Sequence, residues 1–151
     1  MPDLFSVSVE RVVPASPQEV FDLLADARRH PEIDGGGSVR EAVDAPDRLH
    51  RGARFGMRMH MGGPYSMTST VIEFEEQRRI AWQPRPTRSL FATVIGGRVW
   101  RYELTPVEGG TLVRQTWDIR SERFPPALLA YRWRARQDME QTLVRLEERF
   151  R

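Results

Sequence analysis

Six strand-like segments follow one another through the middle of the chain, with no helical pattern between them. They cover residues 39–43, 53–61, 65–75, 79–83, 98–105 and 111–119. Apolar side chains alternate with polar ones along most of these segments, as on half-buried strands. Most of the connections are turns of a few residues rich in glycine and proline, and a longer loop is expected over residues 84–97. Short connections favour antiparallel neighbours, so we expect one antiparallel sheet.

Helical segments flank this run of strands. A strand from Phe5 is expected to end at Pro14, and Ser16-Pro17-Gln18-Glu19 then carries the signals of a helix start. These are an N-cap serine, a proline in the first helical position and a glutamate three residues after the cap, which together satisfy two backbone amides reciprocally. A second short helix is expected over residues 26–31, ended by Pro31.

A long helix is expected to close the chain, from Pro125-Pro126 to about Phe150. At 100° per residue its apolar side chains form one stripe, and at about 1.5 Å per residue it is long enough to cross a sheet. The whole order predicts an α+β domain. The stripe consists of Leu128, Ala135, Met139, Leu143, Leu146 and Phe150.

Length and composition favour one domain spanning residues 1–151. All 23 basic residues are arginine, against 21 acidic ones, so the net charge is +2. The pI of about 9.6 overstates this small excess, because arginine keeps its proton to very high pH. The chain has no cysteine, which excludes disulfides, thiol nucleophiles and cysteine-bound metals. No leader pattern or run of about 18 apolar residues occurs, and we expect a soluble, cytoplasmic protein.

Several short motifs, in this order and spacing, resemble the SRPBCC or START-like helix-grip superfamily. This superfamily includes START domains, birch-pollen-allergen-like (Bet v 1-like) proteins and the polyketide cyclase/dehydrase group. The resemblance implies a curved antiparallel sheet of about seven strands wrapped around the long C-terminal helix, with two short helices after the first strand and an apolar cavity between sheet and helix. The motifs are Pro14-Ala15-Ser16-Pro17 with Glu19-Val20-Phe21, Asp26 through Pro31, Val71-Ile72-Glu73-Phe74 with Arg79-Ile80-Ala81-Trp82, and Trp100-Arg101-Tyr102-Glu103-Leu104 with Gly110-Thr111.

Alternation along the strands predicts a wide interior rich in methionine and aromatic side chains. Such an interior adapts to an irregular apolar ligand, although ordinary core packing explains any one of these residues equally well. The residues expected to point inward are Phe55, Met57, Met59, Met61, Ile72, Phe74, Ile80, Trp82, Trp100, Tyr102, Leu104, Val113 and Trp117.

Four polar residues share this inward side in the predicted pattern. Arg98 has the same parity as Trp100 and Tyr102, Gln115 has the same parity as Val113 and Trp117, and Arg132 falls within the stripe of the last helix. A desolvated arginine needs an anionic partner, which a ligand carboxylate or phosphate would supply. Alternatively, each guanidinium reaches solvent along its own stem. Glu41 shares the side of Val39 and is expected to be an inward acid or, more simply, the partner of one of these arginines.

Catalytic and nucleic-acid motifs are weak. His30, His50 and His60 have no metal-ligand spacing and are expected at the surface, and Gly35-Gly36-Gly37 has the composition of an ordinary turn. No nucleophile elbow or phosphate-binding loop occurs. The arginine and aromatic residues of 131–136 point in different directions on a helix, which favours a solvated flank over a nucleic-acid surface.

The sequence therefore predicts binding of a small hydrophobic or amphipathic molecule, such as a lipid or polyketide, between sheet and terminal helix. Two alternatives remain open: a polyketide cyclase/dehydrase-like enzyme, in which Arg98, Tyr102 or Gln115 polarises a carbonyl, and a stress- or chaperone-associated interaction module. We expect no cofactor, metal, nucleic acid or integral membrane association, and a monomer or homodimer. The predicted ligand contacts are Met57, Met59, Tyr65, Trp82, Arg98, Trp100, Tyr102, Gln115, Trp117, Arg132 and Met139.

Overall fold

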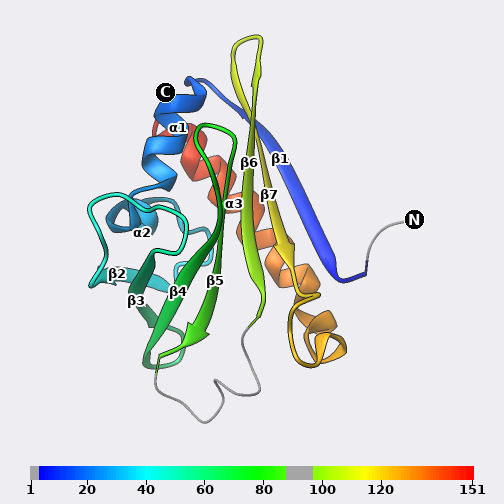
Figure 1. Ribbon diagram of the computed structural model, residues 1–151. Helices are drawn as coiled ribbons and strands as arrows, with labels where there is room; N and C mark the ends of the chain where they lie inside the picture. The colour runs from blue at the N-terminus through cyan, green and yellow to red at the C-terminus, as the bar shows by residue number, and fades with distance from the viewer. Residues whose placement is uncertain (1–3, 88–96) are drawn as a thin grey trace.

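The computed structural model describes residues 4–87 and 97–151, and its central element is a seven-stranded antiparallel sheet (Figure 1). The strand order is β1-β7-β6-β5-β4-β3-β2, so β1 and β2 are the two edges. The predicted strands are confirmed, and β5 runs three residues further than expected, into the predicted loop. The strands are β1 (Ser6–Val13), β2 (Val39–Val43), β3 (Arg54–His60), β4 (Pro64–Glu75), β5 (Arg79–Pro86), β6 (Val99–Val107) and β7 (Gly110–Asp118).

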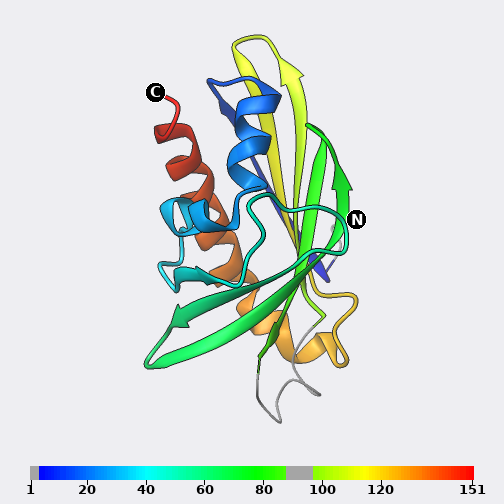
Figure 2. The ribbon, with the colours of Figure 1, turned by 60° about the vertical axis from the view of Figure 1, so that its left-hand side comes forward.

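The helices lie on one side of the sheet, as the two ribbon views show (Figures 1 and 2). The architecture is the predicted helix-grip arrangement, in which the sheet curves around the C-terminal helix. The helices are α1 (Pro17–Leu24), the 3₁₀ helix η1 (Ala27–Arg29), α2 (His30–Ile33), the 3₁₀ helix η3 (Pro125–Tyr131) and α3 (Arg132–Glu148).

The start of α1 follows its sequence signals. The Ser16 hydroxyl oxygen accepts a hydrogen bond from the Glu19 amide at 3.2 Å, and Pro17 occupies the first turn. The return contact differs from the expected one, because the Glu19 carboxylate accepts from the Ser16 hydroxyl at 3.2 Å. The apolar face of α1 is fully buried against the sheet, with Phe21 edge-on to Phe74 at 5.2 Å.

Two helix boundaries differ from the predictions, each in a segment that contains proline. Pro31 is the second residue of α2 and does not end a helix. The N–H groups of the first helical turn have no acceptor within the helix, so the N–H that proline lacks is not needed there. The predicted terminal α-helix begins seven residues late. Residues 125–131 form η3, and the α-helical geometry starts at Arg132, with no side-chain cap from Tyr131.

The inner face of the sheet is read from the strand register. Val7, Trp117, Trp100 and Trp82 form one row across β1, β7, β6 and β5. Ile72 was predicted to point inward. A β-bulge at Val71–Glu73 corrects this prediction, because the extra residue changes the alternation along β4. Val71 pairs with Trp82 and Phe74 pairs with Ile80, so these two point inward, and Ile72 is the extra residue.

The glycine turn before β2 anchors α3. The Gly35 amide donates to the Thr142 hydroxyl at 2.8 Å, and Arg145 donates to the Asp34 carbonyl at 2.7 Å. A Cβ on Gly35 would lie 2.2 Å from the Asp138 carbonyl oxygen, inside contact distance. Gly35 is therefore required for close packing, and the turn has a structural role beyond the ordinary one expected.

The outer face explains much of the arginine content. Arg101 pairs with Glu73 at 2.6 Å and lies 3.6 Å from Asp118, while Arg114 pairs with Glu10 at 2.8 Å. The sequence analysis did not predict that a further arginine, Arg11, lies on the inner side of the sheet. Arg11 pairs with Val113 in the sheet register, and its guanidinium reaches Glu147 of α3 at 3.2 Å.

Candidate functional site

The inner face has two parts that differ in cover. α3 packs chiefly against β1, and also against β7 and α2. The covered half, which we define as the inner side chains of β1 and β7 with those of α3 against them, is closed to solvent at residues such as Val13, Val113 and Leu143. The open half, defined as Met59, Tyr65, Trp82 and Trp100 on β3–β6, is reached by solvent.

Trp82 is the centre of an aromatic cluster in the open half. Its ring stacks on His30, with centroids 4.7 Å apart and planes 18° apart. Tyr102 lies at 5.5 Å in a tilted arrangement, and Phe55 meets it edge-on at 5.9 Å. These contacts fix the Trp82 ring on the inner face, where its side chain is only partly buried.

His30 is buried, which corrects the expectation of a surface histidine. Its Nε2 atom lies 2.8 Å from the Leu24 carbonyl oxygen, and its ring is enclosed by Phe55 and Trp82. Burial lowers the pKa of His30 and outweighs the raising effects of the Leu24 carbonyl, Asp26 and Asp34. The imidazole is therefore neutral at pH 7. His50 and His60 are exposed, as predicted.

The first predicted arginine contact, Arg98, already meets an acidic group of the protein. Arg98 is half-buried, and its Nε lies 3.6 Å from a carboxylate oxygen of Glu122, whose side chain is 2% exposed. The Arg98 amide donates to the same carboxylate at 2.9 Å. An internal carboxylate thus supplies the anion that this arginine needs. Arg132 begins α3 and is half-buried. Glu41 faces outward and pairs with Arg58 at 3.2 Å, so neither role expected for it is correct.

Asp34 is a site residue that the sequence analysis missed. Its carboxylate accepts from the Val39 amide at 3.0 Å, at the end of α2. Burial raises the pKa of Tyr65 and of Tyr102, and the negative charge of Asp34 contributes to both shifts, while Arg98 opposes the shift at Tyr65. Both phenols are protonated at neutral pH. Asp34 precedes three glycines, which made it indistinguishable from an ordinary turn residue in the sequence.

The remaining predicted contacts lie at different depths. Tyr65 is 39% exposed, whereas Tyr102 and Gln115 are each 4% exposed and lie opposite one another on β6 and β7. Met57, Trp117 and Met139 are buried in the core. Met61 was expected to point inward, but it follows the end of β3 and is 65% exposed. The predicted strand residues Met57, Met59, Tyr65, Trp82, Trp100, Tyr102, Gln115 and Trp117 thus share the inner side of the sheet, Arg132 and Met139 belong to α3, and Met61 lies outside the inner face.

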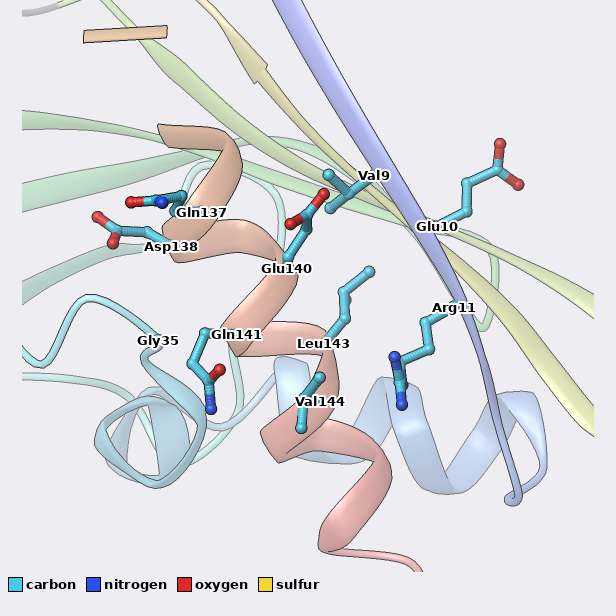
Figure 3. A pocket seen from close by; sticks show the side chains of 10 residues that line it. All are labelled: Val9, Glu10, Arg11, Gly35, Gln137, Asp138, Glu140, Gln141, Leu143 and Val144. Carbon is cyan, nitrogen blue, oxygen red and sulfur yellow. The ribbon is translucent and has the colours of Figure 1, made fainter. Parts of the chain in front are cut away.

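Two surface hollows lie away from the open half. One, of about 700 Å³, runs between β1 and α3, and Figure 3 shows Arg11 directed toward α3 and Glu10 directed away from it. The other, of about 380 Å³, lies among the charged residues of the outer face. None of the predicted ligand contacts lines either hollow. Within residues 4–87 and 97–151, no cluster of three or more histidine and acidic side chains is arranged to hold a metal ion.

The comparison with protein families agrees with this architecture. The family model described as "Polyketide cyclase / dehydrase and lipid transport" matches residues 5–151. The chain belongs to this family. The resemblance inferred from the motifs is thereby confirmed, and the family's description is consistent with a hydrophobic ligand.

Sequence relatives at moderate identity come from Mycobacterium tuberculosis. The uncharacterized protein Rv0088 of strain H37Rv and the uncharacterized protein MT0096 of strain CDC 1551 are each 34% identical over 119 residues. The match covers 78% of this chain and 48% of each relative, so the chain spans about half the length of the curated relatives it matches.

Solved structures share the fold at low identity. Protein CV1439 from Chromobacterium violaceum has a TM-score of 0.72 at 15% identity, covering 97% of this chain and 96% of that one. The Aha1 dimer from Colwellia psychrerythraea has a TM-score of 0.67 at 14% identity, covering 96% and 95%. Ginseng major latex-like protein 151 from Panax ginseng has a TM-score of 0.65 at 9% identity, covering 97% of both chains. These similarities establish the fold alone.

Membrane insertion through a helix is not indicated by the described part of the chain. Neither α3 nor any other helix described there combines the length and the apolar character that crossing a bilayer requires.

Proposed function

We propose that the protein binds a small hydrophobic or amphipathic molecule against the open half of its inner face. The observation that carries the proposal is the solvent exposure of Met59, Tyr65, Trp82 and Trp100 on a face that is otherwise the core of the domain. Large apolar side chains that remain accessible to solvent favour an apolar ligand, because its binding removes their area from water.

Exposed apolar side chains near the open half indicate from which end of the molecule a ligand enters. Further exposed apolar side chains, including Met61, Phe124 and Tyr131, belong to the β3–β4 turn and to η3 with the residue before it. The two ribbon views place these segments at the same end of the molecule (Figures 1 and 2). A ligand approaching that end meets apolar surface before it reaches Trp82 and Trp100.

A charged residue at Met59 tests the proposal. Met59→Glu puts a carboxylate on the inner face, and we expect at least a tenfold loss of affinity for N-phenyl-1-naphthylamine, a neutral fluorophore that brightens in apolar surroundings. Desolvating a charge beside a bound apolar group is unfavourable. The matched control is His60→Glu, which places the same carboxylate one residue further along β3, on the exposed outer side.

The two variants separate binding from general destabilisation. Wild type and His60→Glu are expected to bind the fluorophore equally, with a circular dichroism spectrum shared by all three proteins. Equal affinity of Met59→Glu and His60→Glu would contradict a site in the open half.

A further inference from the structure

Gln115 is a primary amide enclosed in the apolar inner face. It lies at the centre of β7, between Val113 and Trp117, opposite Tyr102 on β6 and Val9 on β1. Its residue is 4% exposed, and its Oε1 atom is buried with no hydrogen-bond partner among the residues described. Buried polar atoms are almost always paired, so this unpaired acceptor indicates that a hydrogen-bond donor from outside the chain binds there.

Tyr102 shares this polar spot with Gln115. The two residues are directly paired across β6 and β7, so their side chains lie on the same side of the sheet at the same level. Burial raises the pKa of the Tyr102 phenol, and the Gln115 side chain opposes that shift. Because Oε1 of Gln115 has no partner, Nε2, which only donates, is the amide atom that faces the phenol oxygen. That arrangement leaves Oε1 as an acceptor and the phenol O–H as a donor.

The pair still offers one donor and one acceptor if the Gln115 amide is rotated by half a turn, so that Oε1 and Nε2 exchange places. With Tyr102 donating to Oε1, Nε2 becomes the available donor and the phenol oxygen an available acceptor. In both orientations the pair offers one donor and one acceptor to a third group. A hydroxyl group matches this pair, because it donates one hydrogen bond and accepts another.

The nearby charges favour a neutral polar group over an anionic one. Asp34 raises the pKa of Tyr102 through its negative charge, so its carboxylate would also repel an anion bound there. Two arginines of the inner side already lie beside carboxylates, Arg98 at 3.6 Å from Glu122 and Arg11 at 3.2 Å from Glu147. An uncharged hydroxyl escapes the repulsion and needs no arginine.

The pair lies within reach of a ligand seated in the open half. Tyr102 follows Trp100 by two residues on β6, about 6.8 Å along a strand. The Tyr102 ring also touches the Trp82 ring at 5.5 Å. A bicyclic aromatic or similar apolar group resting on Trp82 and Trp100 therefore presents its end to Tyr102 and Gln115.

We infer that Gln115 and Tyr102 together bind a neutral hydroxyl group, alcoholic, phenolic or enolic, on the hydrophobic ligand. The inference rests on the proposed function, because it specifies the polar group of the molecule bound in the open half.

A matched pair of compounds tests the inference. 2-Naphthol and 2-methoxynaphthalene share the same ring system, but only 2-naphthol has a hydroxyl that donates. In displacement of N-phenyl-1-naphthylamine from the wild type, we expect 2-naphthol to bind at least tenfold more tightly, although its methyl ether is the more hydrophobic compound. Gln115→Met should remove this preference and keep the affinity for 2-methoxynaphthalene.

Two further variants test whether the preference for 2-naphthol depends on the Gln115–Tyr102 pair. Tyr102→Phe removes the other half of the pair and should reduce the preference at least threefold. Thr116→Val is the control, because Thr116 is the next residue on β7 and its hydroxyl bonds Ser8 on the opposite face at 2.8 Å; the preference should remain. Equal binding of both compounds to the wild type would overturn the inference and leave the proposed function standing. Failure of both compounds to bind would overturn the inference and count against the proposed function as well.

Discussion

The covered half and the open half of the inner face belong to the same sheet but serve different ends. In the covered half, α3 lies directly on β1, and residues such as Val113, Leu143 and Leu146 are closed to solvent. In the open half, side chains that are at least as large, Trp82 and Trp100, remain half-exposed. The difference arises from where α3 is anchored, and we expect stability to reside mainly in the covered half, while the proposed ligand site lies in the open half.

The largest expected effect is on stability in the covered half. Leu143→Ala removes a fully buried side chain and leaves a cavity, so we expect a loss of about 3 kcal/mol in the free energy of unfolding. Met59→Ala in the open half should cost less than about 1 kcal/mol, because that side chain is already partly hydrated. Urea denaturation of both variants measures the contrast, and equal losses would break the distinction between the halves.

The anchor of α3 provides the next largest effect. Gly35→Ala forces a methyl group toward the Asp138 carbonyl, and we expect a loss of about 2 kcal/mol in the free energy of unfolding. Gly63→Ala is the control, because a Cβ there meets no atom within 4 Å. Thermal unfolding compares the two variants. An unchanged Gly35→Ala protein would show that α3 is held on the covered half by other contacts.

His30 lies beneath the open half and makes stability depend on pH. Its pKa is lowered in the folded state, so the unfolded chain binds the proton more tightly, and stability falls as pH decreases below the unfolded value of about 6.5. The contribution is complete above that pH and declines by at most about 1.4 kcal/mol per pH unit. We expect the stability difference between wild type and His30→Phe to shrink from pH 7.5 to pH 5.5. A difference independent of pH would contradict a buried neutral imidazole.

Much of the fold was predictable because its signals are local. Alternation and turn residues placed the strands to within a few residues, and Ser16 with Glu19 marked the start of α1. The errors depend on tertiary contacts or on irregular backbone. The bulge at Val71–Glu73 changes the alternation, and the burial of His30 requires Trp82, a residue 52 positions away in the sequence.

The candidate site was predicted less completely than the fold. Strand parity placed Tyr102, Gln115 and Trp100 on the inner face, as the register has them. Parity does not reveal which partner a charged group finds, so the pairing of Arg98 with Glu122 was missed. It also does not reveal depth, which separates the half-exposed Trp100 from the buried Trp117 beside it.

The smallest expected effect concerns the outer face, which serves as a baseline for both halves. Arg101 and Glu73 form a partly buried ion pair at 2.6 Å, with the carboxylate pKa lowered by that contact. A double-mutant cycle with Arg101→Gln and Glu73→Gln should give a coupling energy of about 1 kcal/mol or less, measured by urea denaturation. Neither variant should alter binding of the fluorophore, and altered binding would show that the outer face contributes to the site.

The most direct test of the ligand site uses the four tryptophan indole N–H signals in a ¹H–¹⁵N NMR spectrum. Single Trp→Phe variants assign the signals, and 2-naphthol is then titrated into the wild type. We predict that the signals of Trp82 and Trp100 shift most, and that Trp133, 69% exposed on the outside of α3, does not shift. Shifts confined to Trp133, or no shift at saturating 2-naphthol, would contradict ligand binding in the open half.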